Sequence, residues 1–215
     1  MRLAWIAGLA CMALAGCRTM QPMSTTSPAV DLAAAAGAQQ VRAAALGLAA
    51  GDCTAPGWAL AGRVALSNGK DGGSGQLEWT QGAGTIHMLL SAPITRQNWA
   101  LEVAPDGATL RGVAKGPLHG DDAAVLLRDA TGWDIPVAAL GCWLRGAEAD
   151  PARFGVARVE YGEDLLPRRI EQGGWTVDYS GWKPDASSRL PMPARINAQR
   201  GDSRVRLVVD RWGLE

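Results

Sequence analysis

The sequence predicts a mainly β fold with helices, in which about ten antiparallel strands share one apolar core. Two observations lead to this fold class. Apolar and polar residues alternate over most of the chain after residue 58, and Gly-, Asn- and Asp-containing turns separate the alternating runs. Helical spacing is confined to one stretch before that residue and one interruption in the middle. Strands with one apolar face cannot stay a flat sheet in water, so they must close into a barrel, pair as a sandwich or curl around an apolar filling.

The N-terminus has the pattern of a bacterial lipoprotein signal. Arg2 precedes an apolar run over residues 3–14, and residues 14–17 read Leu-Ala-Gly-Cys, the order of a lipobox. The run is shorter than the roughly 20 apolar residues of a transmembrane helix. We therefore expect Cys17 to become the first mature residue, with an N-palmitoyl chain and an S-linked diacylglycerol. The alternative is an ordinary signal peptide with an incidental cysteine. Arg18, where aspartate would favour inner-membrane retention, points to the outer membrane.

The chain divides into a signal peptide over residues 1–16, a lipidated N-terminus and flexible tether over 17–30, and one domain over 31–215. The domain opens with an alanine-rich helix that Asp31 caps and Gly51 stops. Its apolar face is expected to hold Leu32, Val41, Leu46 and Leu48.

The strands follow in order. Alternation predicts them over residues 58–66, 77–80, 86–90, 99–103, 108–114, 157–161, 175–179, 194–198 and 205–209. The first five form a meander. Between the fifth and the sixth, Asp121 caps a helix that ends near Gly132, and Pro136 opens a second one before Gly146. This apolar helical pair is the candidate filling of the sheet.

The composition argues for binding and against catalysis. The 21 basic and 21 acidic residues balance without a basic run, which argues against nucleic acid as a partner. His87 and His119 have no metal-ligand spacing around them, so neither a metal nor a cofactor is expected. No nucleophile elbow is present, residues 69–71 lack the Ser or Thr of a phosphate loop, and residues 121–122 resemble helix capping. Nine tryptophans against one phenylalanine suit apolar binding surfaces as well as cores.

Two cysteines remain once Cys11 leaves with the signal and Cys17 is acylated. Cys53 and Cys142 either form a disulfide in an oxidising periplasm or stay as two separate buried thiols. Sequence separation does not choose between these alternatives, because a disulfide depends on the distance between the two Cα atoms.

A series of landmarks follows the lipobox in a fixed order. They are Gly62-Arg63-Val64, Trp79, residues 89–94, residues 132–136, Leu140, Trp143, Leu144, Gly146, Trp175, Tyr179, Trp182, Leu190-Pro191 and Trp212. In this order the chain resembles the LolB family of outer-membrane lipoprotein receptors over essentially the whole mature domain. Residues 31–215 are thereby identified as a LolB-like lipoprotein-binding domain.

The resemblance implies a curved, unclosed antiparallel β-barrel with helices packed in its concave face. A hydrophobic cavity between them would hold the acyl chains of lipoproteins, taken from the periplasmic carrier LolA and placed in the inner leaflet of the outer membrane. The implied partners are LolA, acylated lipoprotein cargo and outer-membrane phospholipid, with the receptor acting as a monomer and without a cofactor.

The resemblance also assigns residues. The family carries a hydrophobic residue, usually leucine after Asn-Pro, on a loop after the third strand. Here Ala92-Pro93-Ile94 occupies that place, so Pro93 and Ile94 are expected to form a membrane-insertion loop. Cys53 and Cys142 are not part of the family pattern. The candidates for the acyl-chain cavity are Trp79, Met88, Trp99, Leu101, Leu126, Leu140, Trp143, Leu144, Trp175, Tyr179, Ile196 and Leu207.

Two other classes of protein fit the same pattern. One is a lipid-anchored, lipocalin-like barrel that binds another hydrophobic small molecule. The other is a purely structural outer-membrane lipoprotein with a dry, packed core. In a generic domain, tryptophans on apolar faces are more often core than ligand lining.

Overall fold

A computed structural model describes residues 30–48, 52–54, 57–82, 84–92 and 97–214. The expectations for Cys17, Pro93 and Ile94, for the signal peptide and for nearly all of the tether lie outside these described residues.

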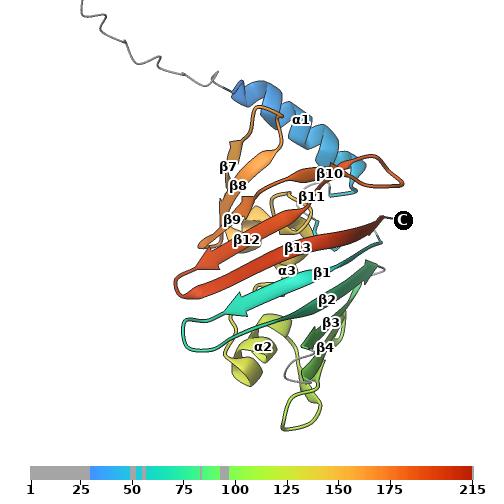
Figure 1. Cartoon of the computed structure of the whole chain (residues 1–215), viewed down its shortest axis with the longest axis vertical. Helices are drawn as coiled ribbons and strands as arrows, with labels where there is room; N and C mark the ends of the chain where they lie inside the picture. Colours follow the sequence, from blue (N-terminus) through green and yellow to red (C-terminus); the bar gives the residue numbers. More distant parts are fainter. Residues whose placement is uncertain (1–29, 49–51, 55–56, 83, 93–96, 215) are drawn as a thin grey trace, which may run out of the picture.

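One antiparallel sheet of eleven strands dominates the fold (Figure 1). One half is a meander of β1 (Trp58–Ser67), β2 (Gly72–Gly82), β3 (Thr85–Ala92), β4 (Gln97–Ala104), β5 (Gly107–Arg111) and β6 (Leu118–Gly120). The other half continues from β1 through β13 (Ser203–Leu214), β12 (Arg195–Arg200), β9 (Trp175–Tyr179), β8 (Pro167–Gln172) and β7 (Arg158–Tyr161). A separate ribbon pairs β10 (Trp182–Pro184) with β11 (Pro191–Pro193).

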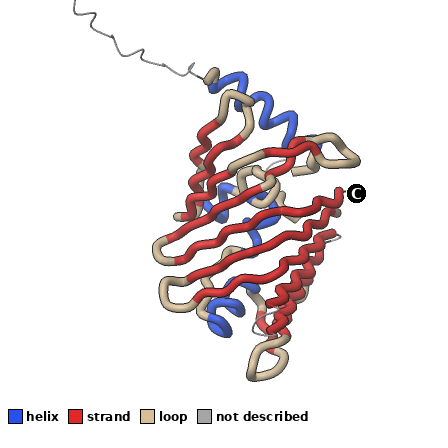
Figure 2. The backbone as a smooth tube through the Cα atoms, in the orientation of Figure 1, coloured by secondary structure: helices blue, strands red, loops and turns tan. Residues whose placement is uncertain are grey.

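The sheet is a curved, unclosed barrel, which confirms the expected fold class. Its strand order runs from β6 at one edge to β7 at the other, and in the described part of the chain these two edges do not pair. Figure 2 shows the strands as one continuous layer that bends strongly, with the helices set against it. The sheet has eleven strands where about ten were expected.

Alternation explains why these segments are strands. Along β1, Trp58, Leu60 and Val64 are buried on the inner face, whereas Arg63 and Ala65 are exposed on the outer face. The buried rings then interlock across strands. The rings of Trp58 and Trp79 stack at 5.7 Å between centroids with planes 15° apart.

In the described residues four helices accompany the sheet: α1 (Leu32–Ala45), α2 (Ala123–Thr131), α3 (Val137–Trp143) and α4 (Pro151–Phe154). In Figure 1, α2 and α3 lie behind the sheet and α1 lies at the opposite end from α2, beside β7, β8 and β10. Asp31 caps α1 as expected, and α2 ends at Gly132 in the left-handed conformation. Asp122 rather than Asp121 caps α2, because its carboxylate accepts from the N–H groups of residues 124 and 125.

The expected apolar face of α1 was wrong for Leu32 and Val41, whereas Leu46 and Leu48, just after the last helical residue, are buried as expected. Leu32 and Val41 are 66% and 72% exposed. The face toward the domain instead carries Ala35, Gln39 and Arg42. Polar contacts to backbone carbonyls, and not a leucine stripe, therefore dock this helix.

Arg42 is the main docking group of α1. Its guanidinium donates to the carbonyl oxygens of Pro191 at 2.9 Å, Gly146 at 3.2 Å and Arg145 at 2.5 Å. It also lies 4.7 Å above the centroid of the Trp182 ring. Burial lowers the pKa of Arg42 to about 10, so the side chain remains charged at neutral pH.

Several other boundaries differ from the sequence-based expectation. The fifth strand ends at Arg111 instead of residue 114, because Gly112 has φ of +85° and leaves the strand conformation. Strands β6, β8, β10 and β11 were not expected.

Candidate hydrophobic binding cavity

An apolar cavity of about 90 Å³ lies between the concave face of the sheet and the helices. Ten of the expected residues line it: Trp79, Met88, Trp99, Leu101, Leu140, Trp143, Leu144, Trp175, Ile196 and Leu207. The wall that faces the cavity is entirely apolar. Any ligand inside would therefore be recognised by burial of apolar surface and not by charge or hydrogen bonding.

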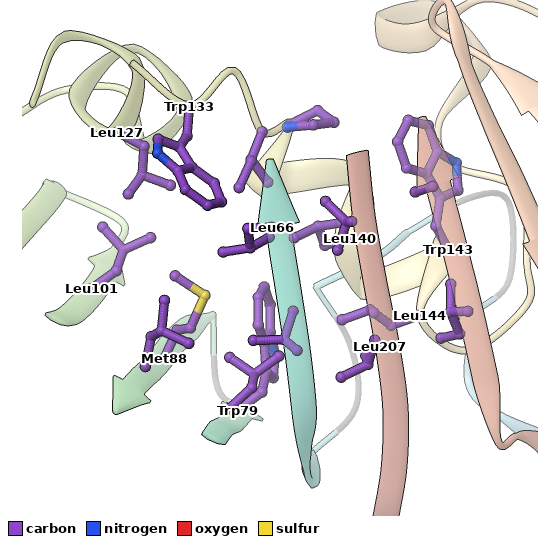
Figure 3. A pocket seen from close by; sticks show the side chains of 18 of the residues that line it. Leu66, Trp79, Met88, Leu101, Leu127, Trp133, Leu140, Trp143, Leu144 and Leu207 are labelled. Atoms are coloured by element: carbon purple, nitrogen blue, oxygen red, sulfur yellow. The ribbon is translucent and has the colours of Figure 1, made fainter. Parts of the chain in front are cut away.

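The sheet and the helical region form opposite walls of this cavity. Figure 3 shows Leu127 and Trp133 from the helical side pointing toward the same space as Met88 and Leu101 from the sheet. The strands supply their inner faces, since every second residue of a strand points to the same side. Residues as far apart in the chain as Val64 and Leu207 thus meet on one wall.

Trp143 is held in place by polar groups on the side away from the cavity. Its indole Nε1 donates to Gln172 Oε1 at 3.0 Å, and its carbonyl oxygen accepts from the hydroxyl of Tyr179 at 2.7 Å. Gln172 also accepts from the N–H of Ala149 at 2.9 Å and donates to the carbonyl oxygens of Ala149 and Gly155, both at 2.8 Å. These buried bonds fix the orientation of α3 against β8 and β9.

A disulfide joins Cys53 to Cys142, which are 89 positions apart in sequence and have their Cα atoms 4.8 Å apart. It ties the segment before β1 to the C-terminal end of α3. The carbonyl oxygen of Cys53 also accepts from Gln81 and, at 3.3 Å, from Arg145. The helix that carries Leu140 and Trp143 is therefore covalently fastened beside the cavity.

Two of the expected cavity residues are not part of its lining. Leu126 packs against Gly120 of β6. A Cβ atom added to Gly120 would lie 3.6 Å from Cδ1 of Leu126. Tyr179 points to the backbone of α3 and packs on Trp182 at 5.6 Å between ring centroids. Burial raises the pKa of its hydroxyl well above the usual value. Both side chains belong to the core around the cavity.

The sequence reasoning also missed lining residues. The largest is Trp133, which lies in the loop between α2 and α3 and is nearly buried. Periodicity could not select it because it belongs to no helix or strand, although it stands out as an aromatic residue between turn formers. The other lining residues that were not selected are Val64, Leu66, Leu77, Leu90, Leu110, Leu127, Thr131, Ile135, Pro136, Val177, Ala198 and Val205.

A second, wider hollow of about 610 Å³, which we call the vestibule, adjoins the apolar cavity. Six residues line both spaces: Val64, Leu66, Leu90, Trp99, Thr131 and Trp133. The rings of Trp99 and Trp133 meet edge to face at 6.2 Å between centroids, so this pair stands where the two spaces join. Ala92, the last described residue before positions 93–96, lies in the vestibule wall.

The histidines take no part in either space. His87 is exposed on the outer face of β3, and His119 Nδ1 lies 3.0 Å from the hydroxyl of Thr109. Within the described ranges, no three or more His, Cys, Asp or Glu side chains gather as metal ligands would. None of the described helices has the length and apolar character needed to span a membrane.

An open sheet curled around an all-apolar cavity, with helices as the facing wall, is an architecture suited to a hydrophobic ligand. A family model described as "Outer membrane lipoprotein LolB" matches residues 56–212. An outer-membrane lipoprotein LolB from Xanthomonas campestris pv. campestris (strain B100) is 40% identical over 212 residues, or 97% of this chain and 95% of that protein. One from Xylella fastidiosa (strain Temecula1) is 39% identical over 158 residues, or 73% of this chain and 71% of that protein.

Among solved structures, a LolA superfamily protein from Nitrosomonas europaea aligns with 80% of this chain and 92% of its own, at a TM-score of 0.48 and 9% identity. The family assignment rests on the sequence comparisons. This chain belongs to the LolB family of outer-membrane lipoproteins. Membership confirms the resemblance, the outer-membrane location and the expectation that the protein is not an enzyme.

Proposed function

We propose that the protein is a lipid-anchored, monomeric receptor that accepts acylated lipoproteins from LolA and inserts them into the inner leaflet of the outer membrane. The observation that carries this proposal is the all-apolar cavity that continues into the vestibule. Membership of the LolB family supports it. Such a receptor has three partners: the carrier, the cargo lipoprotein and outer-membrane phospholipid.

The energetics of acyl chains explain why a closed cavity is needed. A chain of roughly 15 carbons exposed to water costs on the order of 12 kcal/mol, at about 0.8 kcal/mol per methylene. The cargo must therefore pass from one apolar space directly into another. Because no nucleotide hydrolysis drives the transfer, each step must run toward the site with the higher affinity for the acyl chains. The membrane is the last of these sites.

The cavity has to widen before it holds a chain. Its volume of about 90 Å³ is below that of an engineered cavity of about 150 Å³ that binds benzene. The sheet is one continuous hydrogen-bonded layer, and α3 is fastened by the disulfide. We therefore assign the movement to α2 and the loop with Trp133, which supply Thr131 and Trp133 to the lining that the cavity and the vestibule share.

The anchor is tested by intact-mass measurement of the protein extracted from membranes. A mature chain that begins at Cys17 with a diacylglycerol and an amide-linked acyl chain is expected. A mature chain beginning at Met1, or an unmodified Cys17, contradicts the lipoprotein assignment. Cys17→Ala should prevent both lipidation and cleavage at this site.

Delivery to the membrane is assigned to the loop with Pro93 and Ile94. Ala92 in the vestibule wall is followed directly by this loop, so an apolar side chain there would meet the bilayer close to where cargo leaves. Burying one isoleucine in the headgroup region contributes on the order of 1.5–3 kcal/mol. A carboxylate in its place opposes this step, because it resists leaving water.

A two-step assay with purified components separates acceptance from delivery. Ile94→Glu should still receive lipoprotein from LolA but release it poorly into liposomes, and the matched control Ile94→Leu should behave like the parent in both steps. If Ile94→Glu loses both steps, the residue belongs to the binding cavity. If it loses neither, the loop has no role in delivery. Failure of the parent to receive lipoprotein, together with a co-purified pigment or free fatty acid, would favour the lipocalin-like alternative.

A further inference from the structure

The vestibule is wide because the inward-facing positions at one end of β2 and β3, and just after β5, carry little or no side chain. Along β2 the inner face reads Gly73, Gly75, Leu77 and Trp79 from this end toward the core. The inward-facing residue of β3 nearest the vestibule is Ala92, and the one that follows β5 is Gly112. On β2, large apolar side chains therefore fill the inner face near the core and are missing at the mouth.

The backbone needs two of these glycines, whereas the third leaves open space. A Cβ on Gly75 would lie 2.3 Å from the carbonyl oxygen of Ser91, and one on Gly112 would lie 1.8 Å from that of Asn98. A Cβ on Gly73 would meet no heavy atom within 4 Å. Position 73 thus faces a space that a larger side chain would occupy.

The vestibule differs from the apolar cavity in chemistry as well as in size. Its lining includes Asp71 and Thr131 together with the residues of the 72–75 segment, so polar atoms reach this space. It shares the Trp99–Trp133 pair with the apolar cavity. A molecule that is apolar at one end and forms hydrogen bonds at the other would therefore fit across both spaces.

We propose that the vestibule is a separate subsite for the polar head of an acylated lipoprotein: the glycerol esters and the first peptide residues attached to its acylated cysteine. This proposal rests on the proposed function. The acyl chains occupy the apolar cavity, and the ester and amide groups stay in the vestibule, where polar groups and water reach them. The bare inner face of β2 leaves room for a peptide that continues out of the site.

Photo-crosslinking tests where each part of the ligand lies. The full-length lipidated protein, in nanodiscs, receives benzoylphenylalanine at Gly73, at Met88 in the cavity wall, or at Gln76 on the outer face of β2. The probe is a tripalmitoyl-S-glyceryl-cysteinyl peptide, and mass spectrometry locates the crosslink. We expect the Gly73 variant to label the glycerol or peptide, the Met88 variant to label acyl chains, and the Gln76 variant to label nothing.

The outcomes separate this proposal from the proposed function. Labelling of acyl chains from position 73, or no labelling there while position 88 labels the probe, overturns the head subsite and leaves the function intact. No capture of the probe at position 88 contradicts the proposed function itself.

A blocking variant gives a quantitative test. With benzoylphenylalanine at position 88 as the reporter, Gly73→Trp should lower lipopeptide capture at equilibrium by about tenfold or more and change capture of palmitic acid by less than about twofold. Gln76→Trp is the matched control and should change neither. Equal loss of both ligands in Gly73→Trp would mean that the vestibule is part of the acyl-chain site. Thermal unfolding checks the fold, and Gly73→Leu replaces Gly73→Trp if the latter unfolds.

Discussion

Removing the disulfide between Cys53 and Cys142 should be the most damaging single change to the stability of the cavity wall. The bond closes a loop of 89 residues, which in the chain-entropy description contributes about 4–5 kcal/mol by restricting the unfolded chain. Both sulfurs are buried, so Cys53→Ala with Cys142→Ala is the better variant, because serine would bury two hydroxyl groups. We expect the free energy of unfolding to fall by about 3–5 kcal/mol.

Differential scanning calorimetry and urea unfolding measure this effect. A domain of this size loses about 2–4 °C in Tm per kcal/mol, so a decrease on the order of 10–15 °C is expected. Reductant should destabilise the parent by a similar amount and leave the double variant unchanged. Equal urea midpoints for the parent, the reduced parent and the variant would refute the reasoning, because the two thiols would then not constrain the chain.

Three further predictions concern single side chains. Gln172→Leu leaves the indole N–H of Trp143 and the backbone of residue 149 without partners, so urea unfolding should show a loss of about 2–4 kcal/mol. Arg42→Met removes the carbonyl contacts that dock α1, and hydrogen exchange should accelerate in residues 32–45 while β1 and β13 stay protected. Gly112→Ala combines a φ of +85° with a close backbone contact and should lower the Tm, whereas Gly73→Ala meets open space and should leave the Tm unchanged or slightly higher.

The long strands could be predicted because alternation is a local property. Trp58, Leu60 and Val64 face inward simply because every second residue of a strand does, and the turns between successive strands fix the meander of β1–β5. The short strands gave no such signal. β6 and β10 have three residues each, and β8 begins with Pro167 followed by two arginines.

Helix α1 shows the limit of periodicity. Leu32 and Val41 are the larger apolar side chains within the helix and follow the predicted helical periodicity, yet they face outward. The orientation is decided by Arg42 and Gln39, which reach carbonyl groups about a hundred residues away in sequence. A hydrophobic pattern alone does not contain that information, because the acceptors are the backbone of a distant loop.

The sequence likewise predicted some of the cavity residues and missed others. Side chains on the inner faces of long strands, such as Met88 and Leu101, line the cavity because alternation places them there. Tyr179 shares that parity but bonds to the backbone of α3, and Trp133 lines both spaces from a loop without any period. Which inner-face residue meets empty space and which meets a helix depends on where α2 and α3 pack.

The sequence by itself determined the lipobox expectation, the alternating strands, the apolar helical pair and the family, since each is a pattern of neighbouring residues in a fixed order. The tertiary structure decided that the sheet stays open between β6 and β7, that Cys53 bonds Cys142, and that the space between sheet and helices divides into an apolar cavity and a wider vestibule. The physical reason is that a cavity is defined by missing contacts between distant segments. The vestibule has room where Gly73 faces open space, and the Trp99–Trp133 pair stands where it joins the apolar cavity; no local pattern specifies how these elements meet.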